Sequence, residues 1–111
     1  MHDDCPNPEI VLHKNKIGCV IQCAHCGDLL VKVENILYSC NMKSYNSLFN
    51  IINYVESNLE DHMVEIMKEK YVLICTPNDN INLSFSVEDF ELLVELFEQS
   101  KHMLEVNELL S

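Results

Sequence analysis

The sequence contains no arginine, and its seven basic residues are all lysine. Against 18 acidic residues they leave a formal net charge of −11. Because phosphate contacts from lysine and arginine supply most non-specific affinity for nucleic acids, this balance argues against a DNA- or RNA-binding protein. It also argues against binding to an anionic membrane surface. A basic protein partner is compatible with the charge, and so is the simpler interpretation that the charge keeps the protein soluble.

Glycine and long apolar runs are scarce as well. The two glycines, Gly18 and Gly27, are isolated, so the chain lacks a glycine-rich phosphate-binding loop and a flexible linker. No apolar run is long enough for a membrane span. The N-terminus carries acids where a secretory signal carries lysine or arginine. These absences and the length of 111 residues predict a cytoplasmic protein with a single domain, 1–111.

Cysteine, in contrast, is abundant, with six residues in the chain. The reducing cytoplasm argues against a disulfide framework. Only Cys23 and Cys26 form a motif, a Cys-x-x-Cys pair followed by Gly27. A zinc knuckle needs two thiolates two residues apart on a tight turn, with glycine relieving backbone strain after the second. Structural zinc takes four ligands, so this motif provides half of a site.

The remaining metal ligands would come from outside the pair. We expect Cys5 and His13, because one lies upstream on the N-terminal arm and the other on a strand that can pair beside the knuckle. The sequence therefore predicts one structural Zn²⁺, and inert thiols are the alternative. Other residues that could complete the site are His2, Cys19, His25 and Cys40. The two cysteines among these lie on predicted strands and are equally well explained as small buried apolar residues.

A redox role for the pair is not favoured. A thioredoxin-type pair sits at a helix N-terminus, which lowers the pKa of the first thiol. Here Asp28–Val33 has the pattern of a strand rather than a helix, and the acidic Asp28 comes two residues after Cys26. A thiol- or zinc-dependent enzyme centred on Cys23 and Cys26, with His25, stays open as an alternative. It would need a pocket and an activated thiol or an open zinc position, which no pattern in the sequence indicates.

The chain outside the motif divides into an arm and two similar halves. Residues 1–8, with two prolines, predict an extended arm. Residues 9–57 predict the knuckle hairpin and a first helix, and residues 70–111 a second hairpin and a closing helix. The predicted class is α+β, with an antiparallel sheet of about five strands and two main helices on one face. Two β-hairpin–helix units related by an internal repeat, or unrelated halves, both fit this order.

Helix boundaries follow from capping residues. Ser44 is the expected N-cap of the first helix, which ends near Ser57. Ser86, with Asp89 three residues on, resembles a capping box at the start of the closing helix. The intervening residues 59–70, charged with interleaved apolar residues, predict a further short helix.

The closing helix has two chemically different sides. Its predicted apolar face comprises Phe90, Leu93, Val94 and Phe97. The opposite side is acidic, with Glu88, Glu91, Glu95 and Glu98. That side is either a solvated surface or a partner-binding surface. The apolar segment 103–110 could pack across a two-fold axis with the same segment of a second copy. The protein would then be a self-associating structural protein, for example a homodimer.

The order of these features resembles a small family of uncharacterised bacterial proteins, a domain of unknown function found mainly in Bacteroidota. The similarity rests on a glycine before a strand that ends in Cys-x-x-Cys, a later Thr-Pro turn, and a closing helix rich in glutamate and leucine. These residues are Gly18, Cys23, Cys26, Thr76-Pro77, Leu83, Phe90, Leu93 and Leu96. Where family members often show an aromatic residue followed by Gly-Asn, this chain has Val33-Glu34-Asn35. The resemblance supplies no activity, but it implies that the two cysteines of the motif act together.

The sequence as a whole predicts a non-enzymatic binding or adaptor module with a structural zinc knuckle. Its partner would be another protein or a second copy of the chain, with no nucleic acid and no membrane involved.

Overall fold

The structure is a computed structural model in which residues 9–75 and 80–110 are described. The arm expected over residues 1–8, with Cys5, and the Thr76-Pro77 turn lie outside the described residues. Within the described ranges the elements are, in order, β1 (Glu9–Asn15), β2 (Gly18–Cys23), β3 (Leu29–Val33), β4 (Ile36–Cys40), α1 (Met42–Ser57), the 3-10 helix η1 (Leu59–His62), β5 (Met63–Ile66), β6 (Glu69–Cys75), β7 (Asn82–Ser86) and α2 (Val87–Leu110).

The α+β class is confirmed, but the strands form two antiparallel sheets rather than one of about five strands. One sheet has the order β1-β2-β3-β4 and the other β5-β6-β7. The reason is the position of α1 between them. A helix of 16 residues carries the chain about 24 Å away from the end of β4 before β5 begins. The next strands therefore pair with one another instead of extending the first sheet.

The short helix predicted over residues 59–70 is wrong. Only η1 is helical there, and the chain continues as β5, the turn Met67-Lys68 and the start of β6. Met63 lies opposite Val72 and packs against the core, so pairing with β6 outweighs the weak helical pattern. Met67 and Lys68 have φ angles of 52° and 70°, the left-handed conformation of a two-residue hairpin turn.

The first helix begins earlier than its predicted cap. The N-cap is Asn41, not Ser44, and its side-chain Oδ1 accepts a hydrogen bond of 2.9 Å from the Ser44 backbone N–H. Asparagine is as good an N-cap as serine, so both positions were compatible with the sequence. The predicted end of the helix near Ser57 is confirmed. At α2, the Ser86 hydroxyl accepts a 3.1 Å hydrogen bond from Asp89 N–H, as expected from the capping pattern.

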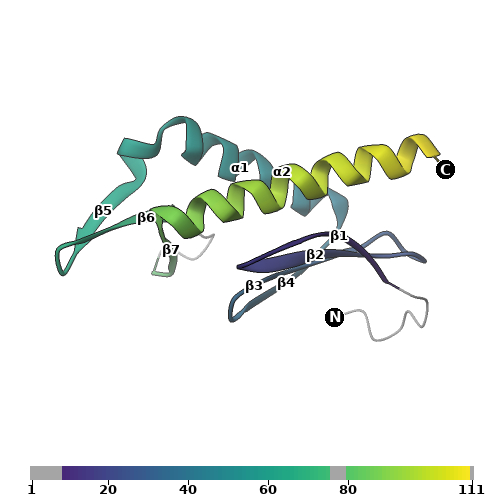
Figure 1. Cartoon of the computed structure of the whole chain (residues 1–111), viewed down its shortest axis with the longest axis horizontal. Helices are drawn as coiled ribbons and strands as arrows, with labels where there is room; N and C mark the ends of the chain where they lie inside the picture. The colour runs from purple at the N-terminus through teal and green to yellow at the C-terminus, as the bar shows by residue number, and fades with distance from the viewer. Residues whose placement is uncertain (1–8, 76–79, 111) are drawn as a thin grey trace.

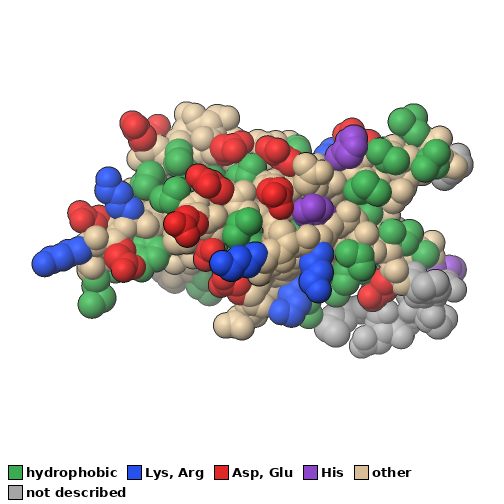
Figure 2. Space-filling model, viewed as in Figure 1, with side chains coloured by type: hydrophobic (Ala, Val, Ile, Leu, Met, Phe, Trp, Pro, Cys, Tyr) green, Lys and Arg blue, Asp and Glu red, His purple; other side chains and the backbone are tan. Residues whose placement is uncertain are grey.

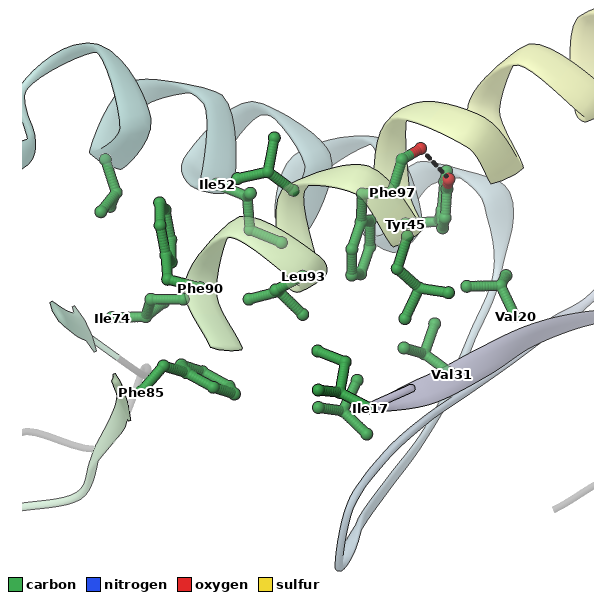
Figure 3. Packing of buried hydrophobic residues seen from close by; sticks show 14 of the residues in the cluster. Ile17, Val20, Val31, Tyr45, Ile52, Ile74, Phe85, Phe90, Leu93 and Phe97 are labelled. Atoms are coloured by element: carbon green, nitrogen blue, oxygen red, sulfur yellow. Dashed lines mark hydrogen bonds between the residues drawn. The ribbon is translucent and has the colours of Figure 1, made fainter. Parts of the chain in front are cut away.

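The long helix α2 holds the two sheets together. Its 24 residues span about 36 Å, and it contacts β1 and β2 of the first sheet and β6 and β7 of the second. Figure 1 shows α2 crossing over both sheets, with α1 running beside it in the opposite direction. The four predicted apolar residues of α2 are all buried. Figure 3 shows residues of both sheets, such as Val20 and Phe85, meeting Leu93 and Phe97 in one core.

One polar pair is buried where the two helices meet. The Tyr45 hydroxyl lies 2.6 Å from Ser100 Oγ, and both side chains are completely buried (Figure 3, dashed line). The Tyr45 hydroxyl also donates to the Phe97 carbonyl at 3.2 Å, and the two aromatic rings stack with centroids 5.4 Å apart. Burial raises the pKa of Tyr45 to about 12. This pair fixes the position of α1 against α2.

Candidate functional site

The Cys-x-x-Cys motif lies, as expected, on a tight turn between two strands. β2 ends at Cys23, and the chain returns into β3 after Asp28. Gly27 N–H donates to the Cys23 carbonyl at 3.1 Å, and Cys23 N–H donates to the Asp28 carbonyl at 2.9 Å. Gly27 has φ +79°, and a Cβ there would make only an ordinary contact of 3.9 Å with Gln22 Nε2, so it is the backbone angle that requires glycine. The Gln22 side chain donates to the Gly27 carbonyl at 3.3 Å and braces the turn.

The two cysteines differ in exposure. Cys23 is buried, whereas Cys26 is exposed at the tip of the turn. No disulfide joins any two of the cysteines within 9–75 and 80–110. The turn therefore carries one buried thiol and one exposed thiol, and its backbone is closed by hydrogen bonds.

His13, one of the predicted metal ligands, lies away from this pair. It is opposite Val20 in the β1–β2 register, whereas Cys23 is opposite Glu9. Val20 and Cys23 are an odd number of residues apart on a regular strand, so they face opposite sides of the sheet, about 10 Å apart along it. His13 instead approaches α2, with its Nε2 3.2 Å from Glu95 Oε1. The structure therefore does not bring this histidine to the cysteines.

The contact of His13 with α2 belongs to a small polar cluster. Asn15 donates to Glu95 Oε1 at 3.1 Å and to the Leu92 carbonyl at 2.8 Å. The hydrogen bond from Asn15, and then that from His13, lower the pKa of the Glu95 carboxyl. These bonds hold β1 against the helix.

Cys5, the other predicted ligand, lies outside the described residues, as does His2. The position of β1 nevertheless limits how far Cys5 can lie from the pair, because Glu9, the first residue of β1, is directly opposite Cys23. Cys5 is four residues before Glu9. Four residues of fully extended chain span at most about 14 Å, so Cys5 lies within about that distance of Glu9. The described residues contain no group of three or more His, Cys, Asp and Glu side chains able to bind a metal ion. A complete site at the knuckle therefore needs a ligand from outside the described residues.

Three further cysteines of the described residues, Cys19, Cys40 and Cys75, lie outside the motif. Cys19 is half-buried on β2 and Cys75 is exposed at the end of β6. Burial, and then the charge of Asp28, raise the pKa of the Cys40 thiol to about 11. At neutral pH this thiol is protonated and a poor nucleophile.

A hollow of about 400 Å³ lies away from the knuckle, on η1 and the β5–β6 hairpin. It is lined by Glu60, Met63, Val64, Glu65 and Lys70. No cysteine or histidine is among these residues, so the hollow does not provide the pocket that an enzyme centred on the Cys-x-x-Cys motif would need.

Strand β4 is a surface feature that the sequence analysis did not identify. Ile36, Leu37 and Tyr38 expose 41%, 48% and 40% of their surface, although they are consecutive and point to alternate sides of the sheet. The sequence of β4 contains the pattern of an unprotected edge strand: five residues without a charge and without alternation of apolar and polar residues. That pattern is ambiguous, because it also fits a fully buried strand.

The acidic side of α2 is exposed, as predicted. Glu88, Glu91, Glu95 and Glu98 are all exposed. Figure 2 shows acidic side chains gathered over the face of the molecule that carries the two helices. Neither helix, within the part of the chain that the structure describes, is long and apolar enough to cross a membrane.

Comparison with known proteins gives one kind of match. A family model described as "Family of unknown function (DUF6686)" matches residues 5–111. No curated protein and no solved structure shows significant similarity to the chain.

Proposed function

The chain belongs to this family of unknown function, and we propose that it is a non-enzymatic binding module of the bacterial cytoplasm whose knuckle is clamped by one structural zinc ion. The observation that carries the metal proposal is the backbone of residues 23–28. Two hydrogen bonds close the turn, and Gly27 with φ +79° follows the second cysteine. A tight turn of this kind, with glycine after the second cysteine, is typical of zinc knuckles, and this supports the proposal.

The proposed ion binds Cys23 and Cys26 together with Cys5. The start of β1 beside Cys23 supports this choice, because it leaves Cys5 within chain reach of the pair. His13, the fourth ligand expected from the sequence, would have to leave Glu95 and reach the other face of the sheet. His2 is another of the candidate ligands in the sequence, and we propose it for the fourth position in place of His13.

The role of the ion would be structural. It would tie the N-terminal residues to the end of β2, and its binding free energy would contribute to the stability of the fold. Cys26 lies outside the hollow on the β5–β6 hairpin, so that hollow gives no support to a catalytic site at the motif.

Thermal unfolding with and without a chelator tests the clamp. In zinc-loaded protein, EDTA should lower the melting temperature clearly, and the double variant Cys23→Ser, Cys26→Ser should melt lower and show no response to EDTA. Cys75→Ser, which removes an exposed cysteine of the other sheet, is the matched control and should behave like the wild type. A wild-type melting temperature that does not change after prolonged incubation with EDTA would contradict the proposal.

The binding role rests on the surface. The net charge of −11 and the exposed acidic side of α2 fit a basic protein partner. Charge reversal of Glu91 and Glu98 to lysine should weaken capture of such a partner and make it less sensitive to salt. The same reversal at Glu56 and Glu60, outside α2, is the control. Equal effects of the two pairs would refute a specific role of α2.

A further inference from the structure

The free edge of the four-stranded sheet is unusually open to pairing. Among the described residues, β4 hydrogen-bonds to β3 on one side only and forms the end of the sheet. Proteins usually protect such edges with charges, proline or a bulge, because free backbone groups recruit other strands. The opposite edge shows this protection: β1 carries Glu9 and Lys14, and its register shifts between Val11 and His13. The five residues of β4 include no charge and no proline, and its pairing with β3 has no shift.

The register identifies the backbone groups that are available. Val33 and Ile36 flank a two-residue turn, which makes them a hydrogen-bonded pair. Hydrogen-bonded residues alternate along an antiparallel pair, so Ile36, Tyr38 and Cys40 direct their backbone groups toward β3. Leu37 and Ser39 direct their N–H and C=O groups away from it. In the described part of the chain no strand lies on that side.

We propose that β4 pairs with β4 of a second copy of the chain, antiparallel and about a two-fold axis that passes beside Tyr38. In this register Leu37 of each copy lies opposite Ser39 of the other, and the outward groups of both residues form four backbone hydrogen bonds. Ile36 lies opposite Cys40 of the second copy, so all five residues of the strand are paired. The two four-stranded sheets become one continuous sheet of eight strands.

The local charges on and beside β4, rather than the net charge, favour a second copy as the occupant. Two molecules of net charge −11 repel each other, so a contact between them must avoid acidic residues, and β4 contains none. At each end of the paired strands, the exposed Glu34 of one copy lies opposite the start of α1 of the other, which carries the exposed Lys43. The two-fold axis repeats this pairing of opposite charges, so the register is complementary to itself. The proposal is independent of the zinc clamp.

The first test uses proline at the edge. Leu37→Pro removes an N–H group that points away from β3, so the β3–β4 ladder keeps its hydrogen bonds while the edge loses a donor and gains a steric block. Analytical ultracentrifugation of the full chain should give the mass of two chains for wild type and of one for this variant, with unchanged circular dichroism. Val11→Lys, on the opposite edge strand, is the control and should keep the mass of two chains.

The second test does not depend on the proline variant folding. Residues that face each other in a non-hydrogen-bonded pair have Cα atoms about 4.5 Å apart, within the range of a disulfide. Tyr38→Cys should therefore form a covalent dimer under mild oxidation that a reductant reverses. Leu37→Cys is the control. In this register the two introduced cysteines would lie diagonally across the strand pair, with Cα atoms about 7–8 Å apart or more, so this variant should cross-link much less. Wild type, with its native cysteines, sets the background.

Two results would overturn the proposal. One is a wild-type protein with the mass of one chain at every soluble concentration, together with no cross-linking of Tyr38→Cys above background; β4 would then be free or pair with a strand of another protein. The other is a dimer that persists in Leu37→Pro with Tyr38→Cys uncrosslinked, which would place the interface elsewhere, such as residues 103–110.

Discussion

Removing the Tyr45 hydroxyl tests whether the buried contact between the two helices is as important as its geometry indicates. Tyr45→Phe deletes the 2.6 Å hydrogen bond to Ser100 and the 3.2 Å bond to the Phe97 carbonyl. Ser100 Oγ keeps the Phe97 carbonyl as an acceptor at 3.2 Å, so no buried donor is left unsatisfied. The expected loss is therefore about 1–2 kcal/mol of unfolding free energy rather than the larger cost of an orphaned group. It corresponds to a fall in melting temperature of roughly 4–8 °C.

The assay is urea unfolding at pH 7 with Tyr45→Phe, Ser100→Ala and the double variant. Because the two residues share one hydrogen bond, the double variant should be less destabilised than the sum of the single variants by about 1 kcal/mol. Tyr54→Phe, at a tyrosine that is 62% exposed, is the control and should change stability by less than about 0.5 kcal/mol. A loss below about 0.5 kcal/mol for Tyr45→Phe, or strict additivity of the two single losses, would refute this reasoning.

The same pair predicts a dependence on alkaline pH. The ordinary pKa of tyrosine is about 10, and the pKa of Tyr45 in the folded protein is about 12. The protonated hydroxyl therefore contributes stability fully below pH 10, and this contribution is lost as the pH rises through the folded value. The difference in stability between wild type and Tyr45→Phe should shrink between pH 10 and pH 12. A constant difference over this range would show that Tyr45 does not titrate as its burial requires.

Three further substitutions test local features of the backbone. Asn41→Ala removes the side-chain cap of α1 and should cost about 1 kcal/mol in urea unfolding, whereas Ser44→Ala should cost less, and the reverse order would contradict the observed cap. Replacing Met67-Lys68 by Asn-Gly relieves two left-handed non-glycine residues and should stabilise by roughly 1–2 kcal/mol; no gain in melting temperature would argue against the turn. Gly18→Ala places a Cβ against the Lys32 carbonyl oxygen and should lower the yield of folded protein or cost more than about 2 kcal/mol, with wild-type stability as the contrary result.

Local signals in the sequence were sufficient for most individual elements. The capping pattern at Ser86 predicted the start of α2, and helical spacing predicted its buried face. The tight turn that carries the Cys-x-x-Cys motif lies between two strands, as expected. Each of these features depends on neighbours in the chain, which is why the pattern alone determines it.

The arrangement of those elements depends on contacts that are distant in sequence. Met63–Ile66 pair with β6 although their charged and apolar residues also fit a helix, so tertiary pairing decided their state. The division into two sheets follows from where α1 sits, and no local pattern encodes that position. Tyr45 and Ser100 are 55 residues apart, and nothing in either segment indicates that the two hydroxyls meet.

The candidate sites show the same contrast. The knuckle was predictable because its two cysteines and Gly27 lie within five residues, and a tight turn needs only local chemistry. The assignment of His13 as a ligand depends on which face of the sheet it occupies. That face is set by the register shift between Val11 and His13, which alternation along the strand does not reveal.

The most direct test of the structural zinc clamp is elemental analysis of untagged protein purified without a chelator. A structural zinc clamp predicts about one zinc ion per chain. It also predicts loss of the metal in the double variant Cys23→Ser, Cys26→Ser and in Cys5→Ser, with retention in Cys75→Ser. Wild-type protein that contains no zinc and takes up none when zinc is added, with both knuckle thiols freely titratable, would contradict the clamp.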